Sequence, residues 1–337
     1  MIYGRLVTSP HSSITEDSVL EFAINSYYDF KMSAADAIME SAGYLLEADD
    51  EENKEEKKEE KKDDSSSSSS GEDGFFAKLV AGIKKIFSSF WNAIKNLFEK
   101  ITGLFKKKAD EAASKESKDK SEADPSWYSE KCKFKNYLKV ADATEISADP
   151  LDDIEKLLDE FIKVFEGNNP KLTEISNMEQ EVSKLRKNPF GKSYEDTLKD
   201  FDPGKQGIKD AVQEYYNNIP EEDSTYGDVI KMFSRDELLK RNKGLVKERN
   251  ELSNFEKSTK TRLGSLEISS KKVLKTDARI KSAIAAFSKF TSSVTKILSY
   301  YVEAYNAKIH LNVMMFKEIG RVKAEGKAQF EKTDDKK

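Results

Sequence analysis

The most regular pattern in the chain lies in residues 75–108, where large apolar side chains recur every three or four positions. Projected at 100° per residue, they fall within an arc of about 140°, with nearly all the lysines outside it. This spacing predicts one amphipathic helix about 51 Å long. Its apolar face, a candidate membrane or partner surface, comprises Phe76, Leu79, Val80, Ile83, Phe87, Phe90, Trp91, Ile94, Phe98, Ile101 and Phe105. The candidate lysines for contact with lipid headgroups are Lys78, Lys84, Lys85, Lys95, Lys106 and Lys107.

The remaining apolar pattern also has a helical period, so a mainly α fold is expected. Residues 127–331 are predicted to form a helical bundle domain. Within it, the capping-box sequence at 234–237 opens one long helix, and apolar residues recurring over 280–316 predict another. With a junction near 275–277, these two helices would form a long antiparallel hairpin on which the 150–220 segments pack.

Polar stretches separate these helical parts. Residues 48–74 hold 12 acidic residues and 5 lysines, and no apolar residue larger than alanine. Because such a stretch buries too little surface to offset its chain entropy, a disordered acidic linker is predicted. Residues 109–126 form a second polar linker, 332–337 a disordered tail, and 1–47 a helical N-terminal segment.

The acidic linker and the amphipathic helix carry opposite charges of similar size. The linker has a net charge of −7, and the 75–108 segment, with 8 lysines and one glutamate, has +7. One hypothesis is that the linker folds over the lysine face and masks it at distances within a Debye length of about 8–10 Å. The alternative is that the linker is a solubilising spacer.

Three roles suit the 75–108 helix. It could lie on an anionic membrane, pack in a bundle or self-associate, or bind the groove of a partner protein. The linkers on both sides and the single sign of the polar face favour the membrane role. Nucleic-acid binding is disfavoured, because the segment has no arginine and its aromatic residues lie opposite the lysines.

The composition argues mainly against enzymes. Cys132 is the single cysteine, and His11 and His310 are the two histidines, so neither a disulfide nor a Cys/His metal site is expected. Phosphate-loop, dinucleotide-binding, nucleophile-elbow and zinc-protease motifs are absent. Acidic pairs such as Asp152-Asp153 indicate solvated faces in so charged a chain. No cofactor, signal peptide or transmembrane span is expected.

Two tripeptides near the end of the N-terminal segment, Ile38-Met39-Glu40 and Leu45-Leu46-Glu47, stand where the composition turns rich in lysine and glutamate. This arrangement resembles the propeptide ends of internal head and prohead-core proteins of large contractile-tailed bacteriophages. The prohead protease of these phages cuts after glutamate in a [Leu/Ile]-x-Glu pattern. The resemblance implies cleavage after Glu40 or Glu47 and a mature chain that begins at Ser41 or Ala48. It covers about 47 residues, and five further tripeptides of this form occur elsewhere.

The sequence therefore favours a non-enzymatic virion protein of the capsid interior or prohead core, with other virion or scaffold proteins, itself or an anionic membrane as partners. The alternative is a cellular membrane-associated or membrane-remodelling helical scaffold. The expected location is the virion or the cytoplasm. Cleavage near Glu47 distinguishes the two readings, whereas both predict lipid binding.

Overall fold

The structure is a computed structural model, and it describes the backbone of residues 15–35, 72–119, 125–137, 146–166, 180–185, 219–270 and 278–334. Within these ranges the side chains of a few terminal helical turns, including residues 72–77, are not described. The described chain is mainly helical, which confirms the predicted fold class.

Four long helices account for most of the described residues. They are α2 (Glu72–Asp119), α4 (Asp149–Glu166), α9 (Arg235–Ser270) and α10 (Ala278–Asp334). A further helix occupies residues 16–35, and a short helical turn covers 180–184. The smaller elements are the 3-10 turn η1 (Ser126–Ser129), the strands β1 (Lys131–Lys135) and β2 (Glu221–Thr225), and the helix α8 (Tyr226–Lys231).

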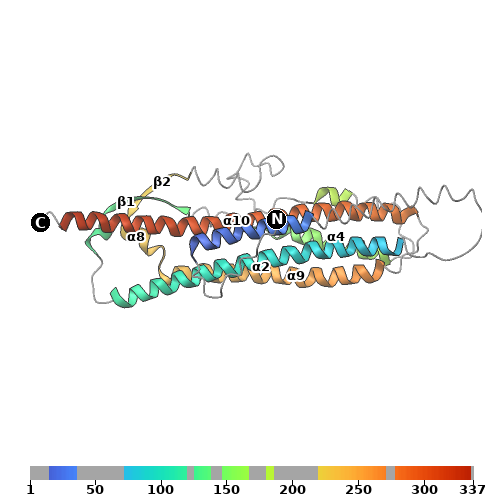
Figure 1. Ribbon diagram of the computed structural model, residues 1–337, viewed down its shortest axis with the longest axis horizontal. Helices are drawn as coiled ribbons and strands as arrows, with labels where there is room; N and C mark the ends of the chain where they lie inside the picture. The colour runs from blue at the N-terminus through green and yellow to red at the C-terminus, as the bar shows by residue number, and fades with distance from the viewer. Residues whose placement is uncertain are drawn as a thin grey trace, which may run out of the picture.

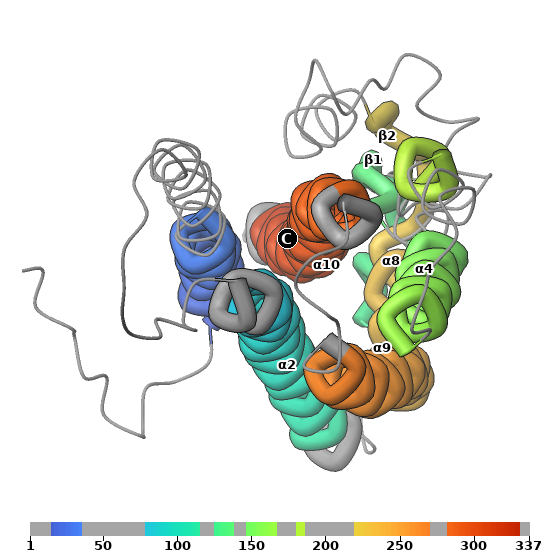
Figure 2. The backbone as a smooth tube through the Cα atoms, turned by 90° about the vertical axis from the view of Figure 1, so that its right-hand side faces the viewer, coloured from blue at the N-terminus to red at the C-terminus, as the bar shows by residue number. Residues whose placement is uncertain are grey.

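The long helices lie side by side and form an elongated bundle (Figure 1). With 57 residues, α10 is about 86 Å long and extends along most of the bundle. Helices α2 and α10 run in the same direction, and α9 runs antiparallel to both. Seen end-on, α2 lies between the 16–35 helix and α9, and α4 lies beside α9 (Figure 2).

Helix α2 lies at the centre of the main hydrophobic core. Its apolar arc contacts α9 on one side, where Trp91 and Phe255 have ring centroids 5.5 Å apart. On the other side it contacts α10, where Phe98 lies 5.0 Å from Tyr305. One continuous cluster of buried side chains therefore includes residues of α2, α4, α9, α10 and the 16–35 helix.

Helix α2 differs in length and surroundings from the predicted 75–108 segment. The sequence favoured a membrane role for this segment and left packing in a bundle open, whereas α2 extends from Glu72 to Asp119 and shares the core of α9 and α10. The helix therefore includes residues 72–74 and 109–119, which the sequence assigned to linkers. Large apolar side chains recur on one face of α2 from Leu79 to Phe105, and burial against two neighbouring helices stabilises this face. The rest of the predicted acidic linker lies outside the described residues.

The predicted pair of long antiparallel helices is present as α9 and α10, although α9 packs mainly against α2 and α4. The predicted cap is also present, since Ser234 Oγ accepts a hydrogen bond from the backbone N–H of Glu237 over 3.4 Å. Helix α10 continues to Asp334, so the predicted disordered tail is at least partly helical.

A small second module rests on the C-terminal part of α10. β1 and β2 pair antiparallel, with Cys132 opposite Ser224 and Phe134 opposite Glu222. The inward side chains of β1 join η1, α8 and α10 in a separate cluster of Trp127, Cys132, Phe134, Tyr226, Val229 and Val322. The sequence analysis did not predict this two-stranded sheet.

Candidate interaction site

The predicted membrane or partner face of α2 is not a surface in the folded chain. Ten of its eleven candidate residues are buried in the core, namely Leu79, Val80, Ile83, Phe87, Phe90, Trp91, Ile94, Phe98, Ile101 and Phe105. The eleventh, Phe76, lies in the first turns of α2, where side chains are not described. Of the three roles considered for this helix, packing in a bundle is the one that the structure shows. Contact of this face with lipid would require α2 to separate from α9 and α10.

The six candidate headgroup lysines lie on the outer side of α2. Lys78, Lys85, Lys95 and Lys106 are exposed, and two others are half-buried. Lys84 forms an ion pair with Glu267 of α9. Lys107 lies 4.0 Å from Glu111 on the next turn of α2. Part of this cationic face is thus paired with acids of the bundle itself, while the acidic linker proposed to mask it lies outside the described residues.

The 16–35 helix contacts both α2 and α10 and lies in the groove between them. Along one face of that helix, Val19, Ala23, Phe30 and Ala34 are all buried, at steps of four or seven residues. The Phe30 ring meets Phe90 of α2 edge-on, with centroids 6.2 Å apart. This is the arrangement of an amphipathic helix in an apolar groove.

Charged contacts fix the N-terminal end of the 16–35 helix. Glu16 lies 2.5 Å from the ammonium of Lys108 in α2, and Asp17 lies 2.7 Å from that of Lys317 in α10. Burial is the largest single effect and acts to raise the pKa of Glu16, but the hydrogen bonds from Lys108 and the backbone, together with the charges of Lys108 and Lys107, outweigh it and hold this pKa below the ordinary value of 4.5. The helix is thereby held in one register against both walls of the groove.

A buried carboxylate occupies the middle of the same groove. Glu303 of α10 is only 8% exposed. Its Oε1 accepts a hydrogen bond from the Tyr27 hydroxyl and lies 3.6 Å from Lys31 Nζ, both from the 16–35 helix. Its Oε2 has no hydrogen-bond partner among the described residues. The donors that satisfy this acid therefore come from the docked helix.

The outer face of the 16–35 helix is also partly apolar. Ile24, Tyr28 and Met32 are spaced four residues apart and are 40%, 55% and 65% exposed. They are on the side away from the groove, so substitutions there test the helix without touching its docking contacts.

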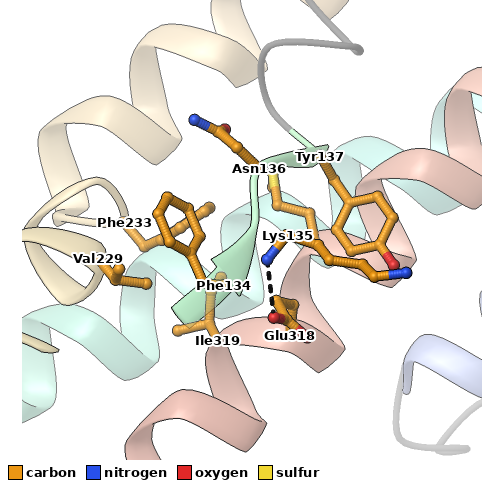
Figure 3. Close-up of a pocket in the computed structure, with 9 residues that line it drawn as sticks. Phe134, Lys135, Asn136, Tyr137, Val229, Phe233, Glu318 and Ile319 are labelled. Carbon is orange, nitrogen blue, oxygen red and sulfur yellow. Dashed lines mark hydrogen bonds between the residues drawn. The ribbon is translucent and has the colours of Figure 1, made fainter. Parts of the chain in front are cut away.

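A second candidate site is a shallow cleft between β1, α10 and the end of α8 (Figure 3). Its volume of about 10 Å³ is roughly the room that one water molecule needs. On its edge Glu318 Oε1 accepts a hydrogen bond from the backbone N–H of Lys135 over 3.0 Å. Arg321 binds Glu318 and also donates to the carbonyl oxygen of Lys133 over 2.9 Å. The cleft thus marks a joint between β1 and α10, held by the hydrogen bonds of Glu318 and Arg321.

Glu318 gives this joint a pH dependence. Burial acts to raise its pKa, but the bonds from Arg321 and from the Lys135 N–H outweigh that effect and lower the pKa below 4.5. A carboxyl group whose pKa is lowered on folding stabilises the protein above its unfolded pKa, and this contribution is lost as the pH falls through the folded pKa.

We expect Glu318→Gln to lower the free energy of unfolding by about 1 kcal/mol at pH 7, since Arg321 is partly solvated and its ion pair is screened. The difference from the parent should shrink in acid, where the parent carboxylate is also protonated. Urea unfolding at pH 7 and below pH 4 measures both values. The matched control is Glu325→Gln, which removes a more exposed partner of Arg321 and should cost less than about 0.5 kcal/mol. A constant difference at both pH values would contradict the assignment.

The remaining candidate groups are the single cysteine and the two histidines. Cys132 is buried in the module of β1, and burial raises the pKa of its thiol, which disfavours the nucleophilic thiolate. His310 is half-buried in α10, and His11 lies outside the described residues. Among the described residues no cluster of His, Cys, Asp and Glu has the arrangement of a metal site. None of the described helices combines the length and apolar character needed to cross a membrane.

Comparison with known protein families, with curated proteins and with solved structures finds no significant match.

Proposed function

We propose that the chain is a non-enzymatic internal head or prohead-core protein of a large contractile-tailed bacteriophage. In this proposal a prohead protease cleaves it after Glu40 or Glu47, and the mature bundle packs in the capsid interior with other virion or scaffold proteins. The proposal starts from the resemblance of the N-terminal segment to processed head proteins. The fold adds a physical reason for cleavage at that place.

The observation that carries the proposal is the position of the [Leu/Ile]-x-Glu tripeptides in the fold. A protease binds an extended stretch of chain, so a site within a packed helix or strand is cut only when that element opens. Leu97-Phe98-Glu99 lies in α2 and Leu158-Asp159-Glu160 in α4, each with its leucine buried. Ile219 is buried and Glu221 begins β2, while Glu16 lies in the 16–35 helix.

Glu40 and Glu47 belong to the stretch between the 16–35 helix and α2, which lies outside the described residues, as does Leu172-Thr173-Glu174. The long helices α2, α4, α9 and α10 all follow Glu47, and they supply most of the main core. Cleavage at either N-terminal site would therefore leave the bundle intact. This matches the proteolytic processing of a protein whose folded body persists.

The test is intact mass and N-terminal peptide mapping of the protein recovered from native particles. We expect a mature chain that begins at Ala48 or Ser41. In bacteria that express the chain without other phage proteins, the uncut chain is the matched control. An uncut chain of full-length mass that still begins at Met1 or Ile2, recovered from particles, would overturn the proposal. An uncut terminus would then support the alternative of a cellular membrane-associated scaffold. Burial of the apolar face of α2 disfavours that alternative, because this face would have to contact lipid.

A further inference from the structure

The contacts that hold the 16–35 helix do not depend on its covalent link to the rest of the chain. That link runs through residues 36–71, from the end of the helix to the start of α2. A link of this length supplies an effective concentration in about the millimolar range. Cutting it removes this concentration effect, and the groove contacts described above then act to keep the helix in place.

The groove itself is specific for a helix of this chemistry. It offers the Phe90 ring to an aromatic side chain and the buried Glu303 carboxylate to a hydroxyl and an ammonium one turn apart. The hydroxyls of Ser33 and Ser89 add a contact of 2.5 Å on the α2 side. An ammonium from the bundle, that of Lys100, lies 4.8 Å from the centroid of the Phe22 ring.

Loss of the helix would also leave the groove in an unfavourable state. Glu303 would lose the two donors described for its Oε1, while its Oε2 has none among the described residues. Phe90 would lose the ring of Phe30 and face water. Water would replace the donors to Glu303, whereas exposing Phe90 and the other apolar side chains that the helix covers is costly, and this cost favours the occupied groove.

We propose that the groove between α2 and α10 is a peptide-binding site that retains the 16–35 helix as a separate polypeptide after the chain is cut. In the native setting this proposal rests on the proposed function, because it requires cleavage after Glu40 or Glu47. The N-terminal fragment is then a second, non-covalent component of the mature bundle, and it is not discarded.

The test uses the full chain with a recognition sequence for a site-specific protease in place of residues 65–70. The chain is cut in vitro and applied to a size-exclusion column at about 10 μM, where a complex with a sub-micromolar Kd stays together. We expect both polypeptides in one peak, in equal amounts by intact mass. A fragment that elutes alone, from a bundle whose helical circular dichroism is unchanged, would overturn the proposal.

Two variants on the same helix separate docking from general effects. Phe30→Ala removes the buried aromatic anchor and should weaken retention by about 100-fold or more, so that the fragment leaves the bundle. Met32→Ala changes an exposed side chain two positions away and should leave the fragment bound. Equal release from both variants would overturn the groove as the cause of retention.

A milder variant keeps the test decisive if Phe30→Ala disturbs the fold. Tyr27→Phe removes only the hydroxyl that donates to Glu303 and should weaken retention by about 5- to 10-fold, measured by titrating the cut fragment back. An unchanged affinity would contradict the role of Glu303.

Because the protease is supplied in the test of the cut chain, its outcome is independent of native processing. If the fragment stays bound in this test but the native protein is uncut, only the proposed function is rejected. If the fragment is released in this test but the native protein is cut, only the proposal of a peptide-binding groove is rejected.

Discussion

Replacing Phe90 by alanine is expected to lower the free energy of unfolding by about 3–5 kcal/mol, the largest loss for any single substitution considered for this chain. Phe90 is fully buried in α2 and contacts Phe30 of the 16–35 helix and Tyr301 of α10, with ring centroids 6.2 and 6.5 Å apart. Its removal opens a cavity where three helices meet, and neighbouring rings cannot close around it without moving whole helices.

Urea unfolding followed by far-ultraviolet circular dichroism measures this loss. Ser88→Ala, on the exposed side of the same helix, is the matched control and should change the free energy of unfolding by less than about 0.5 kcal/mol. If the two variants were equally stable, the apolar face of α2 would not be in the core, and the helix would be available for the membrane role that its sequence suggests.

Substitution of Gly326 by alanine is the second large expected effect. A Cβ atom built on Gly326 of α10 would lie 2.4 Å from two ring atoms of Trp127 and 3.1 Å from the Tyr226 ring. Since Trp127 is buried at this contact, the ring must move or η1 must lift away from α10. We expect a loss of about 2–3 kcal/mol in the free energy of unfolding, with tryptophan emission shifted to longer wavelength as Trp127 meets water.

Gly320 offers an unusually direct control for this prediction. It lies in the same helix, and a Cβ there has no heavy atom within 4 Å. Gly320→Ala should therefore be neutral or stabilise the protein by up to about 1 kcal/mol through helix propensity. If Gly326→Ala were as well tolerated as Gly320→Ala, the module of η1, β1 and α8 would not be docked on α10.

The helical elements could be predicted because their signals are local. The periodic apolar face of α2, the cap at Ser234 and the apolar series of α10 each depend on neighbouring residues. The partner of an apolar face is not a local property. The face of α2 has the same side chains whether it meets lipid or Phe255 and Tyr305, so periodicity alone could not place it in the core.

The groove and the small sheet escaped the sequence analysis for the same reason. Glu303 meets Tyr27 across most of the chain, and one glutamate in a chain with 62 acidic residues gives no signal. The alternation in Lys131–Lys135 did carry a weak sign of a strand, with Cys132 and Phe134 on one side. Its partner β2 reads Glu-Glu-Asp-Ser-Thr and has no apolar residue, so only the fold reveals the pairing.

The central place of α2 in the core has a consequence for the order of synthesis. The ribosome completes α2 at residue 119, but the two helices that cover its apolar face are complete only at residues 270 and 334. At translation rates of about 5–20 residues per second, that face waits roughly 10–40 s for its last partner. During this interval the nascent chain presents a cationic helix with an uncovered aromatic face, preceded by a strongly acidic stretch already outside the ribosome. Chaperone capture and adsorption to anionic surfaces are therefore hazards of the growing chain, and closure of the bundle ends them.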